Sequence, residues 1–334
     1  MTSLALTISE TLRYRGKLGQ WSWVLHRISG LGTLFFLFLH VIDTSWASLS
    51  PALYKQAISQ YQSPLFTFGE FVLVACVVYH SLNGFRIVLF DSRPKWWKYQ
   101  ERAALIVLIV TLVVLVPTFV IMFAEVLRHY GAVGVDFKLG EIITSNAQFV
   151  AAIIAILALG IVISTVYSFV PGVNTASAGR TVRHGSRFDR IMWSYMRISG
   201  VIMLPLVLGH LLMMHIIQGV FRITEVVTPV GTTMVNTTGT AVNFVAIRWN
   251  TMFAGVAVWR VYDILMLVLV ALHGFYGLHY AVNDYVHNRT INRGIQIAAF
   301  MTALGLIVIG GLAILSTIPV DTSAMIQQAA QVTR

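Results

Sequence analysis

The chain has 334 residues, of which 57% are hydrophobic and only 11% charged, and its formal net charge is +10. A soluble domain carries roughly 25% charged residues, so this composition excludes a soluble globular protein and indicates an integral membrane protein. The single cysteine, Cys76, excludes an internal disulfide and a metal cluster held by several thiolates.

Seven stretches are apolar over the roughly 20 residues that a helix needs to cross a membrane. In chain order they are residues 24–48, 66–90, 103–126, 148–171, 196–220, 258–283 and 295–318. The sequence therefore predicts an all-α membrane protein with seven transmembrane helices.

The first and fifth of these stretches contain the same four residues, Arg-Ile-Ser-Gly, at 27–30 and 197–200. In both, nine residues separate the glycine from a histidine, which is His40 in the first stretch and His210 in the fifth. This repeat predicts that the two halves of the chain fold alike.

A second pair of histidines lies in the second and sixth stretches. His80 and His273 are each followed four residues later by a glycine, Gly84 and Gly277. Because glycine has no side chain beyond hydrogen, a flat group can approach the backbone closely at these positions. Ionisable residues within a membrane are costly and usually functional, so the four histidines need a common explanation.

The repeat also predicts the domain organisation. Residues 1–127 are expected to form one three-helix unit, and residues 190–334 a second unit with the same orientation. Two parallel units require one further crossing between them. The span 148–171, which has no charged residue and no histidine, is the expected connector within the intervening segment 128–189. Parallel repeats also occur in transporters, so the repeat alone does not define a function.

Basic residues lie mostly on one side of the predicted spans. Thirteen fall in the N-terminal segment and the loops 91–102, 172–190 and 284–294, against six on the opposite side. By the positive-inside rule, the N-terminus is expected in the cytoplasm and the C-terminus outside. Membrane topology thus explains the positive charge, and no nucleic-acid partner is expected.

This topology sorts the four histidines by depth, at 1.5 Å per helical residue. His80 and His273 lie nearer the cytoplasm, and His40 and His210 nearer the outside. Haem iron binds neutral imidazole on both faces in electron-transfer cytochromes, so the two pairs predict two haems b, each held between helices. His215, one turn beyond His210, is an alternative ligand, and a histidine proton relay in a transporter is an alternative function.

Two sets of motifs resemble the membrane-anchor subunits of succinate dehydrogenase. Those similar to the larger anchor subunit are His26-Arg-Ile-Ser-Gly30, Tyr79-His80, Gly84, Arg86 and Asp91. Those similar to the smaller anchor subunit are His273, Gly277 and Asp284-Tyr285. The chain thus resembles a fusion of the two subunits, with the connector span as an addition.

The resemblance implies a role for each motif. Histidines matching His80 and His273 bind a haem near the cytoplasm, and those matching His40 and His210 bind a second haem in two-haem members. Contacts to haem or its propionates are expected from His26, Gly84, Arg86, Gly277 and His279. The quinone site is expected beneath the iron–sulfur subunit, at Trp23, Arg27, Ser29, Asp284 and Tyr285.

One departure from the family pattern concerns the quinone. Single-haem members that reduce ubiquinone carry a serine three residues before the His-Arg pair, where this chain has Trp23. A tryptophan can stack on the wider ring of a naphthoquinone, which favours menaquinone over ubiquinone.

The remaining chemistry must come from partners. The chain has no dinucleotide-binding glycine motif and no cysteine quartet, so a flavoprotein subunit and an iron–sulfur subunit are expected on its basic cytoplasmic face. The expected function is a dihaem cytochrome b anchor that carries electrons from succinate to quinone in the cytoplasmic membrane of a bacterium or an archaeon. An anchor of a quinol:fumarate reductase is the nearest alternative.

Overall fold

The computed structural model describes residues 17–61, 64–133, 187–213, 241–286 and 288–319, together with isolated positions between 140 and 166. Apart from an isolated β-bridge between Phe253 and Val256, regular structure in these residues is helical. Six helices are long and apolar enough to cross a membrane, which confirms the predicted fold class. The connector span 148–171 lies largely outside the described residues, so the seventh crossing stays a prediction.

The six long helices divide equally between the two halves of the chain. Those of the first half are α2 (Leu18–Leu49), α4 (Pro64–Ser92) and α5 (Gln100–Val133), the last preceded by a 3-10 segment, η1 (Pro94–Tyr99). Those of the second half are α8 (Arg187–Leu211), α10 (Val258–Tyr285) and α11 (Arg289–Leu315).

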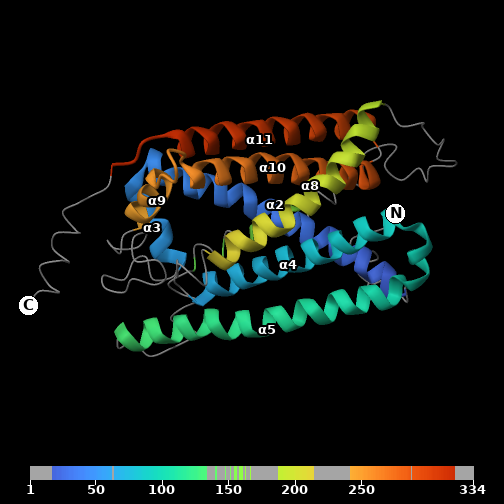
Figure 1. Ribbon diagram of the computed structural model, residues 1–334, viewed down its shortest axis with the longest axis horizontal. Helices are drawn as coiled ribbons and strands as arrows, with labels where there is room; N and C mark the ends of the chain where they lie inside the picture. Colours follow the sequence, from blue (N-terminus) through green and yellow to red (C-terminus); the bar gives the residue numbers. More distant parts are fainter. Residues whose placement is uncertain are drawn as a thin grey trace, which may run out of the picture.

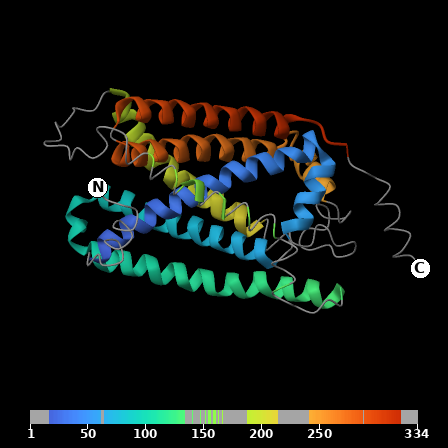
Figure 2. The ribbon, with the colours of Figure 1, turned by 180° about the vertical axis from the view of Figure 1, so that it is seen from behind.

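The four helices that carry the histidine motifs form the centre of the bundle (Figure 1). Helix α2 packs against α4 and α10, and α8 packs against the same two helices, so among these four helices the halves meet at two interfaces, α2 with α10 and α4 with α8. Helix α5 lies outside α4, and α11 lies outside α10 and α2, as the view from behind also shows (Figure 2). The outward faces of α5 and α11 are exposed and apolar, as lipid contact requires.

Three helix starts differ from the sequence prediction by six residues or more. Helix α2 begins at residue 18 rather than 24, α8 at residue 187 rather than 196, and α11 at residue 289 rather than 295. Arg187 and Arg190, expected in the loop 172–190, therefore lie in the first turn of α8. Polar residues interrupt an apolar run without interrupting helical hydrogen bonds, so these helices continue beyond the part that hydrocarbon covers.

Two short helices were not predicted. Helices α3 (Pro51–Tyr61) and α9 (Ala241–Asn250) pack together at the end of the bundle opposite the start of α2 (Figure 1). We refer to α3 and α9 as the cap, and to the opposite end, where α2 and α8 begin, as the base. With at most 11 residues, neither cap helix can span a membrane, so a search for long apolar runs passes over them.

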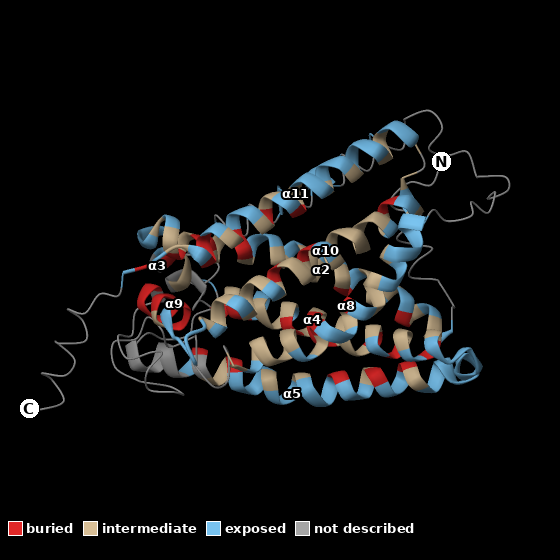
Figure 3. Ribbon diagram, turned by 45° about the horizontal axis from the view of Figure 1, so that its top comes forward, coloured by how far each residue is buried: buried red, intermediate tan, exposed pale blue. Residues whose placement is uncertain are grey.

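The cap is tightly packed, and α9 is buried along most of its length (Figure 3). Its Arg248, 3% exposed, forms an ion pair of 3.3 Å with Asp263 of α10, to which the Trp249 indole N–H also donates at 2.9 Å. Arg260 of α10 donates to the carbonyl of Trp249. Burying Tyr54 of α3 raises the pKa of its hydroxyl. These contacts fix the cap over the ends of the central helices.

Candidate functional site

The His80 ring is held between α2 and α4. It stacks on the His26 ring with centroids 4.0 Å apart, and its Nδ1 lies 3.0 Å from the carbonyl oxygen of His26. A carbonyl can only accept, so Nδ1 donates and the lone pair of Nε2 is left for another partner. Histidines that bind metals are usually fixed in this manner by their second ring nitrogen.

The second half holds His273 by a similar contact. Its Nδ1 lies 2.9 Å from the hydroxyl of Ser199, which in turn donates to the carbonyl of Met196 at 3.4 Å. The hydroxyl therefore accepts from His273, and Nε2 again keeps its lone pair. His273 of α10 lies within electrostatic range of both His80 and His26, and the pairing of His80 with His273 stays a prediction.

The serine and glycine of the repeated motif support these two histidines. Ser29 is buried and donates to the carbonyl of His26 on its own helix, the same carbonyl that accepts from His80. A Cβ on Gly30 would lie 2.7 Å from Cε1 of His80, whereas one on Gly200 would lie 3.5 Å from Cε1 of His273.

The glycines singled out from the sequence are less crowded than Gly30. A Cβ on Gly84 would meet Cε1 of His26 at 3.5 Å, and one on Gly277 would meet a methyl of Met196 at 3.8 Å, both ordinary contacts. The closest approach of a histidine ring to a glycine is therefore at Gly30 on α2, and not at Gly84 or Gly277 as predicted.

Gly30→Ala should destabilise the His80 site, while Gly200→Ala is the matched control. The His80 ring is stacked and hydrogen-bonded, so it cannot yield to a new methyl group without losing contacts. Overpacking of this kind costs about 1–3 kcal/mol, which should appear as a lower thermal midpoint. Equal midpoints for the two variants would contradict the tight packing at Gly30.

His40 and His210 face one another from α2 and α8. Their ring centroids are 6.2 Å apart and their planes are 78° to each other, and Phe36 stacks on His40 at 5.2 Å. Two imidazole nitrogens about 2 Å from one metal ion place their ring centroids roughly 6 Å apart. The donor set and its spacing thus fit an iron bound between the two rings. His215, the alternative ligand, lies outside the described residues.

The two remaining residues expected at a haem differ in what they contact. Arg86 is buried and donates to the carbonyl of Gln100 at 3.2 Å, and its Nε has no hydrogen-bond partner within the described part of the chain. A buried guanidinium with a spare donor suits an anionic group such as a propionate. His279 instead uses both ring nitrogens, with Gln296 at 2.7 Å and Asn283 at 2.9 Å, in joining α10 to α11.

At the base, α2 and α10 bring together four of the five residues predicted for quinone. Arg27 forms an ion pair with Asp284, and its guanidinium carbon lies 3.9 Å from the centroid of Trp23 and 5.9 Å from that of Tyr285. Both aromatic rings are partly exposed. Nη1 of Arg27 is buried without a hydrogen-bond partner among the described residues. An oriented guanidinium with a spare N–H is a suitable donor to a carbonyl oxygen.

A second cluster that also combines a tryptophan, an arginine and an aspartate lies between α8 and α4, and the sequence analysis missed it. Arg197 forms an ion pair with Asp91, and its guanidinium carbon lies 3.3 Å from the centroid of Trp193. The repeat could have revealed it, since Trp193 and Arg197 follow Trp23 and Arg27 by 170 residues. Each half thus supplies an arginine to the aspartate of the other half.

Comparison with known proteins gives three findings. Residues 7–121 match the family described as Succinate dehydrogenase/Fumarate reductase transmembrane subunit. The succinate dehydrogenase 2 membrane subunit SdhC of Mycobacterium tuberculosis is 38% identical over 135 residues, which are 39% of this chain and 99% of that protein. The succinate dehydrogenase hydrophobic membrane anchor subunit of Halobacterium salinarum is 31% identical over 105 residues, which are 30% of this chain and 80% of that protein. No solved structure matches.

Proposed function

The chain belongs to the family of succinate dehydrogenase and fumarate reductase membrane anchors, and from this premise we propose that it carries electrons from succinate to membrane quinone. The observation that carries this proposal is the cluster of Trp23, Arg27, Asp284 and Tyr285 at the base. The chain is a multi-pass membrane protein. Each relative matches well under half of the chain, and we propose that the rest holds a second anchor unit fused to the first.

We propose that the chain binds two haems b, one between His80 and His273 and one between His40 and His210. The free Nε2 lone pairs of the first pair and the 6.2 Å separation of the second support this assignment. Haem held by two histidines accepts and releases single electrons without a change of ligands. Arg86, and His26 stacked on His80, are the proposed polar neighbours of the first haem.

The base cluster explains how quinone is held for reduction. Arg27 donates from Nη1 to one carbonyl oxygen and stabilises the negative charge that arrives with the electrons. The hydroxyl of Tyr285 donates to the same headgroup, and the indole of Trp23 stacks on its ring. Asp284 fixes the guanidinium and, being partly exposed, can relay the protons that quinone takes up.

The proposed partners are a flavoprotein subunit, which oxidises succinate, and an iron–sulfur subunit between it and this chain. The η1 segment at the base exposes basic residues, Lys95 and Lys98, on the side where that subunit would dock. The second basic segment on the predicted cytoplasmic face, residues 180–190, lies outside the described residues up to residue 186, while Arg187 and Arg190 are exposed in the first turn of α8.

Succinate titration of the purified complex tests the proposed function. Succinate should reduce a cytochrome with b-type absorbance, and added quinone should reoxidise it. A seven-helix transporter would show no such absorbance. A quinol:fumarate reductase would show it but turn over faster from quinol to fumarate than from succinate to quinone.

We further propose menaquinone as the acceptor, because the Trp23 indole lies beside the Arg27 donor. Trp23→Ser should raise the KM for a naphthoquinone several-fold more than the KM for a benzoquinone, because the wider ring loses more stacking area. Steady-state turnover with both acceptors measures this change. An equal effect on both would remove the case for menaquinone.

The proposed orientation has the base in the cytoplasm and the cap outside. In sealed right-side-out vesicles, a membrane-impermeant amine reagent should therefore modify Lys55 of α3 but not Lys95 or Lys98. Lys138, also predicted outside, lies beyond the described residues. Mass spectrometry identifies the labelled peptides. Labelling of Lys95 would contradict the proposed orientation and place the base outside.

A further inference from the structure

The Arg197 cluster has the features that make the Arg27 cluster suitable for quinone. Its guanidinium lies on an indole and is paired with a carboxylate, and its Nε is buried without a hydrogen-bond partner among the described residues. The two clusters lie on opposite interfaces of the central helices, α2 with α10 and α8 with α4. The second cluster is therefore not part of the first site.

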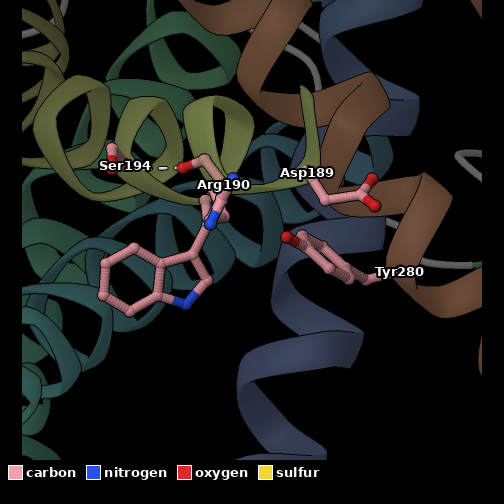
Figure 4. Close-up of a pocket in the computed structure, with 5 residues that line it drawn as sticks. Asp189, Arg190, Ser194 and Tyr280 are labelled. Carbon is pink, nitrogen blue, oxygen red and sulfur yellow. Dashed lines mark hydrogen bonds between the residues drawn. The ribbon is translucent and has the colours of Figure 1, made fainter. Parts of the chain in front are cut away.

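A pocket opens beside this second cluster. It has a volume of about 530 Å³ and is lined by Asp189, Arg190, Trp193, Ser194 and Tyr280 (Figure 4). Trp193, half exposed, belongs both to the pocket and to the cluster. Pockets of roughly 300–1,000 Å³ hold small organic ligands, so this one can accept a ring system.

The charges around the pocket indicate the class of ligand. The carboxylate of Asp189 accompanies Arg190 in the lining, and Asp91 neutralises Arg197. The surroundings are thus close to neutral and disfavour an anionic phosphate headgroup. The indole of Trp193 and the hydroxyl of Tyr280 instead suit a neutral, flat ring that bears carbonyl acceptors, while the Ser194 hydroxyl donates to the carbonyl of Arg190.

From these observations we propose that the second half of the chain holds a second quinone site, formed by Trp193, Arg197 and the adjoining pocket. This inference rests on the proposed function, because it takes the Arg27 cluster as the site of reduction. Ser92 follows Asp91 where Tyr285 follows Asp284, and its hydroxyl donates to its own helix at 2.8 Å. The second site therefore has a phenol in its pocket lining, Tyr280, but none next to its ion pair, so we expect it to bind quinone less tightly than the first.

Equilibrium binding of a short-chain naphthoquinone to the quinone-depleted, detergent-purified complex tests the proposal. The wild type should bind two equivalents, with different affinities. Trp193→Ala should lose the weaker equivalent and Trp23→Ala the tighter one. Phe188→Ala, which removes an exposed aromatic ring of the same helix outside the pocket lining, is the matched control and should keep both. Arg197→Lys provides a second variant that keeps the charge and should weaken the same equivalent as Trp193→Ala.

The outcomes separate the two proposals. A single equivalent in the wild type that disappears in Trp23→Ala would overturn the second site and leave the proposed function intact. Two equivalents that both survive Trp193→Ala and Arg197→Lys would also overturn it. If Trp23→Ala kept both equivalents and full succinate-to-quinone turnover, the assignment of the first site would fail instead.

Discussion

Arg27→Ala is expected to lower succinate-to-quinone turnover by one to two orders of magnitude. The variant removes the donor of the base cluster and leaves Asp284 without its ion-pair partner. A tenfold change in rate corresponds to about 1.4 kcal/mol in the activation free energy, which is the scale of one or two polar contacts. Tyr285→Phe, which loses only the hydroxyl, should show the smaller effect of the two.

Two controls make this result specific to quinone. Electron transfer from succinate to a soluble artificial acceptor should survive in Arg27→Ala, because that route bypasses the membrane chain. Arg289→Ala removes an exposed arginine from the first turn of α11, at the same end of the bundle, and should leave quinone turnover within twofold of the wild type. Unchanged quinone turnover in Arg27→Ala would show that the quinone site is not at the base. The surroundings of His40 and His210 would then be the next place to test.

His40→Ala and His210→Ala are each expected to abolish the same haem and to leave the other in place. The two ring centroids are 6.2 Å apart, so a haem held between them would lose one of its two histidines in either variant. Low-temperature difference spectra should therefore lose the same band in both variants. His80→Ala and His273→Ala serve as reciprocal controls and should remove the other band.

Two results would contradict this pairing. Retention of both haems in His210→Ala, with loss of one in His215→Ala, would show that the ligand lies one turn farther along the chain. Loss of one haem in His40→Ala and of the other in His210→Ala would show that the pairs form within each half. The fold makes the second result unexpected, because His40 on α2 and His210 on α8 lie close together although they belong to different halves.

The long apolar runs of the sequence were enough to predict the membrane-spanning helices. Six of the predicted spans correspond to helices, and His40 and His210, which the repeat paired, lie with their ring centroids 6.2 Å apart. The cap could not be predicted in the same way, because α3 and α9 are short and owe their burial to tertiary contacts. Arg248, an unremarkable loop residue in the sequence, becomes 3% exposed through its pairing with Asp263.

Site prediction had the same limit. Trp23, Arg27, Asp284 and Tyr285 could be grouped because a family pattern connects them, although 257 residues separate the arginine from the aspartate. Ser29 was assigned to the same group, yet its hydroxyl donates to the His26 carbonyl, since residues two positions apart, such as Arg27 and Ser29, point to nearly opposite sides of a helix. Neither the periodicity of a helix nor the spacing along it indicates the Arg197–Asp91 pair. The pair could be found by matching Arg197 with Arg27 and Asp91 with Asp284 in the two halves.

The haem-to-chain ratio of the purified complex tests the central claim most directly. Pyridine haemochrome absorbance gives the haem content, and quantitative amino-acid analysis of the isolated chain gives the protein content. Two bis-histidine pairs predict a ratio of two, with both haems reducible by succinate. A ratio of one, or none, would contradict the dihaem anchor.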